Sequence, residues 1–429
     1  MSSVLGRVWN AWLALFVAIG CSNEPSADSG RAGAPGTSAG TAGRTAASAG
    51  TFNAGAGTGA ATATGGAAGA FDSSGASGAS VAAGAAGMGA SGGSAAGQAG
   101  VQGGAPGGAG MAGSHAGSTG AFSYPPAASE HRAIGTHDPS MIRVDDRFYL
   151  LATGGLLSVR TSTDLAKWTN AGNIFSAPPS WIKNALGQAI SDFWAPDISV
   201  VNGTYRVYYA ASTFGSKHSV IGLATNTTLD RQNAAYKWVD EGLIIESNAS
   251  GASDDWNAID PNAIADADGN WWLVFGSFWS GIKLRRLDPV TGKLSSADTK
   301  LYALAAHSGG IEAPSIIWHN GYYYLFVSFD ACCKGVDSTY RTMVGRASTI
   351  TGPYTDADGK AMLQGNAVQL LAKDGRYIGP GGGSAFRDGE QYFYVYHYYD
   401  GQMNGASELM LRPIQWKNDW PELGTPLWQ

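Results

Sequence analysis

The stretch His137-Asp138-Pro139-Ser140 and the strand-forming run behind it decide the fold, because the chain repeats this arrangement five times. In each copy, a polar residue beside a proline precedes a short apolar run, a turn signal and an aromatic-rich run. The turn signals are Asp145-Asp146, Asn202-Gly203, Asp268-Gly269, Asn320-Gly321 and Asp388-Gly389. Asn-Gly and Asp-Gly between strand-forming runs are strong hairpin signals, because both residues tolerate a positive φ. The repeat therefore predicts five hairpins.

The spacing of the copies, about 50 to 70 residues from turn to turn, is typical of propeller blades. A blade is a four-stranded sheet, so a further strand should follow each hairpin. Five apolar runs stand at the required places: 157–160, 221–224, 282–285, 343–346 and 409–412. We predict an all-β fold, a five-bladed β-propeller that occupies residues 123–429.

The first 21 residues are predicted to be a signal peptide and not part of the fold. Arg7 precedes an apolar run, residues 8–20, which is too short to span a bilayer. The run ends at Cys21 and resembles the lipobox of bacterial lipoproteins, although Ala18 stands where leucine is usual. We expect an exported protein, either a bacterial cell-surface lipoprotein anchored by a lipid at Cys21 or a secreted protein.

Residues 22–122 consist mainly of Gly, Ala, Ser and Thr. Such a composition buries too little apolar surface to offset the entropy lost on ordering, so we expect a disordered, flexible tether.

The net charge of −6, without a basic cluster, argues against nucleic acid as a partner. Nothing in the sequence indicates more than a monomer. Apart from Cys21, the cysteines are the adjacent pair Cys332 and Cys333, and no spacing resembles a zinc site. Neighbouring Cα atoms lie about 3.8 Å apart, below the usual disulfide range. The pair is therefore either two thiols or one strained disulfide.

Carboxylates recur at one point of the repeat. The innermost strand of each blade lines the channel of a propeller, so residues at one repeat position should converge on a single axial site. We place Asp138, Asp197, Asp260, Glu312 and, in the fifth blade, Gly379 at this position. Each Asp-Pro could alone be an ordinary turn. As a set, neighbouring carboxylates raise one another's pKa and indicate a catalytic site.

Several motifs in order carry a resemblance to a known family. They are His137-Asp138-Pro139-Ser140, Trp194-Ala195-Pro196-Asp197, Ile259-Asp260-Pro261-Asn262 and Glu312-Ala313-Pro314. This set resembles the family-43 glycoside hydrolases, which are five-bladed propellers. More narrowly, residues 276–282, 332–335, 338–340 and 396–401 resemble the endo-α-1,5-L-arabinanases. The resemblance covers about residues 124–429.

The resemblance implies catalytic roles for three carboxyls. Asp138 is similar to the family's general base, Glu312 to its general acid, and Asp260 to the residue that raises the pKa of the acid and orients it. Asp197 is expected to support the site, held by backbone amides. Inverting glycosidases use such an acid and base about 6.5 to 9.5 Å apart.

The same resemblance implies binding roles. His397 matches a residue that contacts a metal, usually calcium, in the channel; the alternative is a histidine satisfied within the core. Candidates for sugar contacts are Trp194, Gly215 beside Phe214, Asn257, Ser277 and Trp279. For the two tryptophans the alternative is strand packing.

These features predict a glycoside hydrolase that cleaves internal α-1,5-L-arabinofuranosidic bonds of arabinan with inversion. One alternative is an exo-acting arabinofuranosidase or β-xylosidase on the same fold. The other is a non-catalytic carbohydrate-binding propeller, which would have no need of Asp138, Asp260 and Glu312 together.

Overall fold

Five antiparallel sheets of four strands follow one another along the chain in the computed structural model, which describes residues 122, 124 and 133–427. Blade 1 contains β1 (Ser140–Val144), β2 (Arg147–Ala152), β3 (Ser158–Ser162) and β4 (Thr169–Asn173). Blade 2 contains β5 (Trp194–Val201), β6 (Thr204–Ala211), β7 (Ser219–Asn226) and β8 (Val239–Ser247). Blade 3 contains β9 (Asn262–Ala265), β10 (Trp271–Phe275), β11 (Ile282–Leu287) and β12 (Tyr302–Ala305).

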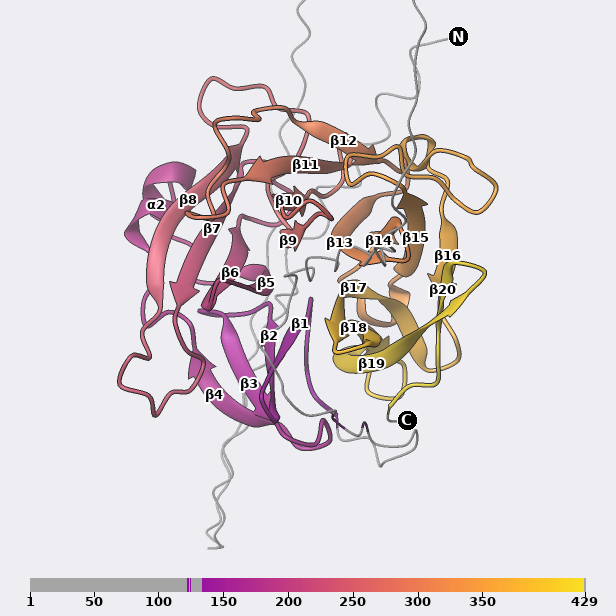
Figure 1. The fold of residues 1–429 in the computed structure, drawn as a ribbon, viewed down its shortest axis with the longest axis horizontal. Helices are drawn as coiled ribbons and strands as arrows, with labels where there is room; N and C mark the ends of the chain where they lie inside the picture. The colour runs from indigo at the N-terminus through magenta and orange to yellow at the C-terminus, as the bar shows by residue number, and fades with distance from the viewer. Residues whose placement is uncertain (1–121, 123, 125–132, 428–429) are drawn as a thin grey trace, which may run out of the picture. The chain divides into compact units, whose positions relative to one another are not determined.

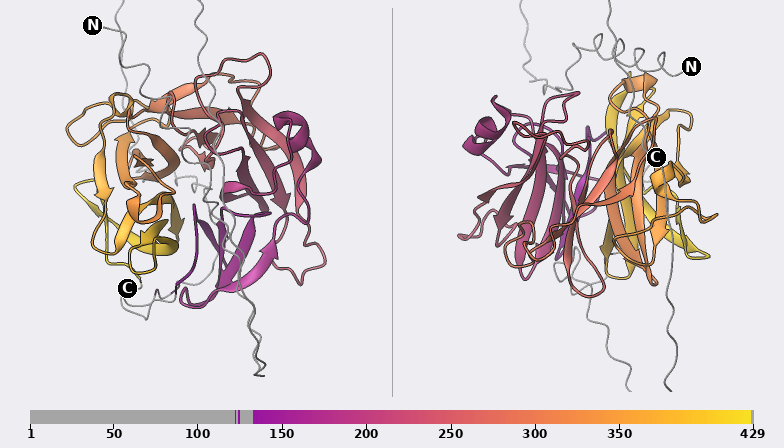
Figure 2. Two further views of the ribbon diagram at one scale, coloured as in Figure 1. Left: turned by 180° about the vertical axis from the view of Figure 1, so that it is seen from behind. Right: turned by 90° about the horizontal axis from the view of Figure 1, so that it is seen from above.

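Blade 4 contains β13 (Ile311–His319), β14 (Tyr322–Phe329), β15 (Arg341–Ala347) and β16 (Val368–Leu371). Blade 5 contains β17 (Tyr377–Asp388), β18 (Gln391–Asp400), β19 (Ala406–Lys417) and β20 (Trp420–Leu423). The blades are arranged around a common centre (Figure 1), and their strands run roughly along the axis between them (Figure 2). The predicted five-bladed propeller is confirmed.

The predicted turns all lie between the first and second strands of a blade. Both residues of Asn202-Gly203 and of Asn320-Gly321 have positive φ, as a tight hairpin of the mirror-image type requires. In the two Asp-Gly turns only the glycine does, so there aspartate does not need the left-handed region. All five predicted third-strand runs overlap β3, β7, β11, β15 or β19.

Within the described residues, helical structure is confined to connections between strands. One helix, α2 (Ser180–Leu186), joins β4 to β5 and ends at Gly187 with φ 72°. The 3₁₀ turns η1 (Gly335–Asp337) and η2 (Met362–Gln364) flank β15. Within the described part of the chain, no helix is long and apolar enough to cross a membrane.

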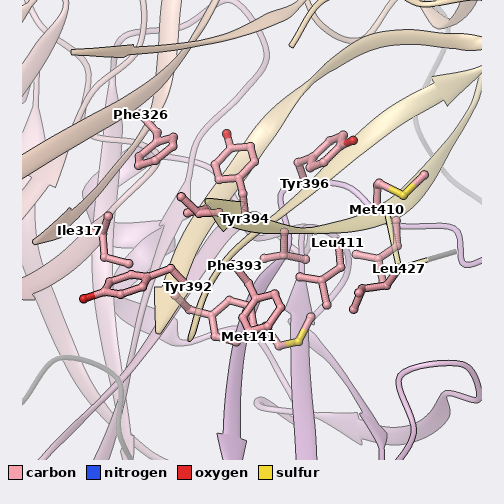
Figure 3. Close-up of a cluster of buried hydrophobic side chains, with 14 of the residues drawn as sticks. Met141, Ile317, Phe326, Tyr392, Phe393, Tyr394, Tyr396, Met410, Leu411 and Leu427 are labelled. Atoms are coloured by element: carbon pink, nitrogen blue, oxygen red, sulfur yellow. The ribbon is translucent and has the colours of Figure 1, made fainter. Parts of the chain in front are cut away.

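The core consists of side chains packed between neighbouring blades. Figure 3 shows one such cluster, in which Tyr394 and Tyr396 of β18 lie beside Phe326 of β14 and Met410 of β19. Phe122, which the sequence places at the end of the tether, belongs to this packing because its ring meets the Phe148 ring edge-on at 4.9 Å between centroids. The rest of the tether and the signal peptide lie outside the described residues.

A ring of hydrogen bonds links the innermost strands of the five blades. In blades 1 to 4, a polar side chain of the inner strand accepts a hydrogen bond from a backbone N–H of the next blade. Between blades 5 and 1, a serine hydroxyl of blade 5 donates a hydrogen bond to a backbone carbonyl just before β1. The bonds run from Ile198 N to Ser140, Ala263 N to Asp197, Ile316 N to Asn262, Ala385 N to Ser315, and Ser384 Oγ to Pro139 O, at 2.8 to 3.1 Å. The same strands line a central cavity of about 60 Å³. The inner strands therefore line the channel as predicted.

The ends of the described propeller are joined by backbone pairing. Thr136 N donates to Ser407 O at 3.1 Å, and Leu409 N donates to Ile134 O at 3.0 Å. The residues before β1 thus pair with β19, a strand of the fifth blade. This pairing holds the first blade against the last.

Candidate active site

An X-Pro dipeptide with an unusual backbone begins the inner strand of every blade. The residues before the prolines are Asp138, Ala195, Asp260, Ala313 and Gly379, with φ between 42° and 55°. A residue before proline normally adopts an extended conformation, and four of these five are not glycine. Strained backbone of this kind occurs at functional sites, where the surrounding structure holds it.

This alignment corrects the predicted register of the carboxyls. Asp138 and Asp260 are equivalent to each other and to Gly379, but Glu312 stands one residue before its position and Asp197 two residues after it. In blades 2 and 4 the polar residue stands at a different offset from the X-Pro bond, so it does not mark one repeat position. Asp138 and Asp260 are therefore the only carboxyls among the five residues that directly precede these prolines. Glu312 is attached to the backbone one residue earlier in its blade.

Asp197 has a structural role in the ring between blades. Its two carboxyl oxygens accept hydrogen bonds from Asn262 Nδ2 at 3.0 Å and from Ala263 N at 2.8 Å. Burial raises the pKa of Asp197 to about 6 despite these bonds. The expectation that a backbone amide holds this carboxyl is confirmed.

Asp138 is held as an ionised carboxylate. Its Oδ2 accepts hydrogen bonds from His137 Nδ1 at 2.8 Å and from Thr153 Oγ1 at 2.7 Å. Burial alone would raise the pKa of Asp138, but the charge of His137 and these hydrogen bonds outweigh burial and lower it to about 2. Because both bonds go to Oδ2, Oδ1 is left to face a reactant.

Glu312 is held toward its protonated form. Burial and the charge of Asp138 raise the pKa of Glu312, against the hydrogen bonds that it accepts from Tyr340 and Ser277. The Tyr340 hydroxyl donates to Oε1 at 2.7 Å and the Ser277 hydroxyl to Oε2 at 3.0 Å. The carboxyl is thus fixed at both oxygens.

Asp260 belongs to the same electrostatic cluster. Burial and the charges of Glu312 and Asp138 raise the pKa of Asp260 well above its usual value, although Oδ2 accepts the Ala313 N–H at 2.9 Å. The charge that raises the pKa of Glu312 comes from Asp138. The charge of Glu312 is one cause of the raised pKa of Asp260, so the two carboxyls disfavour joint ionisation.

His397 is fully buried and stacked on His137 at 3.8 Å between ring centroids. Its Nδ1 accepts the Asp138 backbone N–H at 3.1 Å, whereas its buried Nε2 has no partner within the described residues. Burial and the charge of His137 lower the pKa of His397 well below its usual value, so the ring is neutral. Because Nδ1 accepts the Asp138 N–H, the proton of the neutral ring lies on Nε2, which can donate to a water molecule; only the other tautomer offers Nε2 to a metal ion.

A run of glycines brings the fifth blade close to these groups. Gly381 pairs with His397 of β18, and the register of β17 with β18 shifts between Gly381 and Ser384, where Gly382 and Gly383 stand. A Cβ on Gly382 would lie 2.4 Å from Asp138 Oδ1 and 2.4 Å from His397 Cε1. Sequence analysis missed this contact, although three successive glycines in a strand signal a bulge or a close approach.

The expected sugar-binding residues differ in their exposure. Trp279 is 47% exposed and stands in the loop between β10 and β11 beside Phe278; both have positive φ, 40° and 50°. Gly215 is exposed, with φ 80°, next to Phe214, whose side chain is 77% exposed. These two loops present uncovered aromatic rings, as a sugar-binding surface requires.

The remaining candidates are more enclosed. Trp194 is half-buried at the start of β5 and packs against the core between blades 2 and 3. Asn257 is buried, and its Oδ1 accepts the Ser219 hydroxyl at 2.6 Å. Ser277 is buried against Glu312, a contact that sequence analysis did not anticipate. Direct sugar contact by these three residues stays a prediction.

The adjacent cysteines form a disulfide, which decides between the two alternatives left open by the sequence. The pair is half-buried, and Cys333 Sγ lies 3.7 Å from His137 Nε2. The disulfide is therefore part of the wall of the candidate site.

A five-bladed propeller that brings together one carboxyl with a lowered pKa and one with a raised pKa holds the two groups that a glycoside hydrolase uses. Residues 133–421 match the model of the glycosyl hydrolases of family 43. The chain belongs to this family and is a glycoside hydrolase.

Two similar relatives are named as an arabinanase and an arabinofuranosidase. An extracellular endo-α-(1→5)-L-arabinanase of Bacillus subtilis is 44% identical over 292 residues, which cover 66% of this chain and 86% of the relative. An extracellular exo-α-(1→5)-L-arabinofuranosidase of Cellvibrio japonicus is 37% identical over 305 residues, which cover 68% of this chain and 87% of that relative.

Solved structures agree with both fold and family. An α-L-arabinanase of Cellvibrio cellulosa in complex with arabinohexaose superposes with a TM-score of 0.66 at 34% identity, covering 68% of this chain and 96% of that chain. An endo-arabinanase of Bacillus licheniformis superposes with a TM-score of 0.63 at 42% identity, covering 68% of this chain and 99% of that chain.

Proposed function

We propose that this protein is an endo-arabinanase that hydrolyses internal α-1,5-L-arabinofuranosidic bonds of arabinan with inversion of configuration. One observation carries the chemistry: the site lowers the pKa of Asp138 to about 2 and raises that of Glu312. Two carboxyls with pKa values pushed apart in this way supply a base and an acid at one pH. The substrate class follows from the relatives, which are named for arabinan-type bonds.

In this mechanism Asp138 is the general base. The hydrogen bonds from His137 and Thr153 occupy Oδ2, so Oδ1 takes the proton of the attacking water. Glu312 donates its proton to the departing glycosidic oxygen, held in place by Tyr340 and Ser277. Because water attacks the face opposite the leaving group in one step, the anomeric centre inverts.

The role proposed for Asp260 is to keep Glu312 protonated and oriented. The two buried carboxyls disfavour joint ionisation, so a proton held between them is available to Glu312. Its hydrogen bond to Ala313 N, the residue next to the acid, fixes the backbone that carries Glu312. Trp194, Gly215, Asn257, Ser277 and Trp279 are proposed to surround the bound sugars.

Endo action is favoured over exo action because the B. subtilis relative and the B. licheniformis structure are named endo-arabinanases. The C. japonicus relative, named for exo action, supports an exo-acting arabinofuranosidase as the second candidate. The deciding experiment is the time course of products from debranched linear arabinan, followed by chromatography. An early ladder of mixed oligosaccharides is expected. Arabinose or one short product from the start would identify the exo enzyme.

Two further outcomes test catalysis itself. Asp138→Ala should abolish turnover on arabinan and on aryl arabinosides alike; retained activity would remove Asp138 from the role of base. A folded wild-type protein without turnover on any of these substrates would instead be a carbohydrate-binding propeller.

We also propose that calcium binds in the channel beside His397, where it would fix the local charge and organise water. The unpartnered, buried Nε2 of a neutral ring supports a ligand there. Because Nδ1 accepts the Asp138 N–H, the proton of the neutral ring lies on Nε2, and His397 would hold a water molecule bound to the ion. Direct ligation by Nε2 would need the tautomer with the proton on Nδ1, which would remove the acceptor of the Asp138 N–H. Calcium prefers oxygen, so water molecules would have to supply most of its ligands.

Calcium content after dialysis tests this site directly. Wild-type protein should retain about one ion per chain and His397→Ala none. His319→Ala is the control, because that ring stacks on Trp416 and is half-buried elsewhere. Equal calcium content in wild type and His397→Ala would refute the site.

Export is proposed from the apolar run at residues 8–20 and from the two relatives named extracellular. We further propose a lipid on Cys21, with the tether carrying a monomeric propeller away from the membrane. Cys21→Ser should move the protein from the membrane fraction to the medium. If wild-type protein is already in the medium, the proposal of a lipid anchor at Cys21 is refuted and only the proposal of secretion remains. Light scattering of the secreted variant tests the monomer.

A further inference from the structure

The disulfide between Cys332 and Cys333 lies directly against the residue that holds the proposed general base. Cys333 Sγ is 3.7 Å from His137 Nε2. The disulfide stands in the connection from β14 to β15. Two hydrogen bonds close this connection into a loop: Thr339 N donates to Ala331 O at 3.0 Å, and Ala331 N donates to Thr339 Oγ1 at 3.2 Å. The loop is thus a closed unit with one side on the site.

Three successive hydrogen bonds lead from the disulfide to Asp138. The Cys333 backbone N–H donates to the Tyr399 hydroxyl at 2.7 Å. That hydroxyl is 2.9 Å from His137 Nε2, and His137 Nδ1 is 2.8 Å from Asp138 Oδ2. One peptide of the loop is therefore connected to the carboxylate through two side chains.

The order of protons in this series is consistent at every step. When the His137 ring is neutral, the Tyr399 hydroxyl accepts from the amide and donates to Nε2, which leaves the ring proton on Nδ1, facing Asp138. When the ring is protonated, Nδ1 still donates to Asp138. The series orients the imidazole in both states, and the imidazole in turn occupies Oδ2 and leaves Oδ1 for water.

The disulfide fixes the peptide at which the series begins. Cys333 has φ 64°, in the left-handed region, which a residue other than glycine leaves when the surrounding structure permits. A bond between the two adjacent side chains restricts the rotations that would allow this. Without the bond, Cys333 can relax to a commoner conformation and turn its N–H away from Tyr399.

We propose that the Cys332–Cys333 disulfide and Tyr399 are positioning elements for the general base, so that reduction of the disulfide slows the chemical step without weakening substrate binding. The inference rests on the role of Asp138 given under Proposed function. Reduction by a phosphine breaks the S–S bond with two electrons; the phosphorus takes the oxygen of one water molecule, and the two protons of that water complete two thiols.

The experiment compares kcat and KM on linear arabinan before and after phosphine treatment, with free thiols counted. Appearance of two additional thiols should lower kcat by about tenfold or more, since a small misplacement of a catalytic group has effects of this size. KM should stay within about twofold, and reoxidation should restore kcat. Cys332→Ser/Cys333→Ser should start with the low kcat and not respond to the phosphine.

Tyr399→Phe tests the middle of the series. The oxidised variant should show the same loss of kcat, and reduction should add little, because both changes break one series of bonds. Tyr392→Phe is the matched control: it lies on the same strand, β18, within the core cluster and away from His137. It should keep the wild-type kcat and the wild-type response to the phosphine.

Two outcomes would overturn the inference. One is two new thiols with unchanged kcat. The other is a rise in KM at constant kcat, which would mean that the loop only shapes the substrate groove. Both differ from failure of the proposed function, in which the oxidised wild-type protein has no activity on arabinan or Asp138→Ala keeps it.

Discussion

Asp138 and Glu312 occupy one buried site, yet their pKa values are shifted in opposite directions. Hydrogen-bond donors decide the difference: Asp138 has the imidazole of His137 and the hydroxyl of Thr153 on one oxygen, while Glu312 receives only hydroxyl bonds and faces the charge of Asp138. A cation beside one carboxyl and an anion beside the other separate their pKa values. The assignment of base and acid depends on these few neighbours.

Glu312→Ala should therefore show a dependence on the leaving group. Activity on arabinan should fall by about a hundredfold or more, the usual contribution of a general acid, because the departing sugar alkoxide needs a proton. Aryl arabinosides with acidic phenols need little protonation and should lose much less. The comparison of kcat/KM on the two substrates measures this, and equal loss on both would contradict the acid role.

Ser277→Ala should change the pH profile. The Ser277 hydroxyl bonds to Glu312 Oε2 and lowers its pKa, since a donor stabilises the carboxylate. Without it, the pKa of Glu312 rises, so the acid stays protonated to higher pH. The alkaline limb of kcat/KM should move upward by about half a pH unit, the effect of one modest hydrogen bond. A raised KM with an unmoved limb would instead indicate that Ser277 contacts the sugar.

At the scale of elements, the glycine bulge of β17 sets how closely the fifth blade approaches the base. Gly382 and Gly389 have nearly the same φ, 57° and 60°, but differ in surroundings. A Cβ at Gly389 meets nothing within 4 Å, whereas one at Gly382 collides with Asp138 and His397. Substitution of Gly389 therefore measures backbone strain alone, whereas substitution of Gly382 measures strain together with crowding of the site.

Gly389→Ala should cost about 1 kcal/mol of unfolding free energy, the penalty for a left-handed alanine, with normal kcat. Gly382→Ala should carry the same penalty and also lose most activity, because Asp138 or His397 must move. Chemical denaturation and kcat on arabinan measure the two effects. Normal activity of Gly382→Ala would show that the bulge has no part in holding the base.

The blades could be predicted from the sequence because their signals are local. A turn such as Asn320-Gly321 specifies its own hairpin, whatever the rest of the chain does. The register of Glu312 could not be predicted in this way, since it depends on which residue precedes the proline in each blade. Contacts such as Cys333 with Tyr399 join residues 66 positions apart, and no pattern within one blade specifies them.

At the scale of the whole molecule, the ring of inner-strand hydrogen bonds makes the stability of the propeller depend on pH. Asp197 joins blade 2 to blade 3, and burial raises its pKa to about 6. An unfolded aspartate titrates near 3.8, so the folded protein binds the extra proton between these values. Stability from Asp197 is therefore fully present below pH 4 and declines as the pH rises through 6.

Asp197→Asn should remove this dependence, because an amide does not titrate. The unfolding free energy of the wild type, relative to that of the variant, should fall by about 3 kcal/mol between pH 4 and 7, from the two pKa values. Denaturant titrations of both proteins across this range measure the difference, and Asp230→Asn, at an exposed residue, serves as control. A constant difference between wild type and Asp197→Asn would mean that the carboxylate is ionised in the folded ring throughout. The hydrogen bonds from Asn262 and Ala263 would then outweigh burial, and the link between blades 2 and 3 would be a charged one.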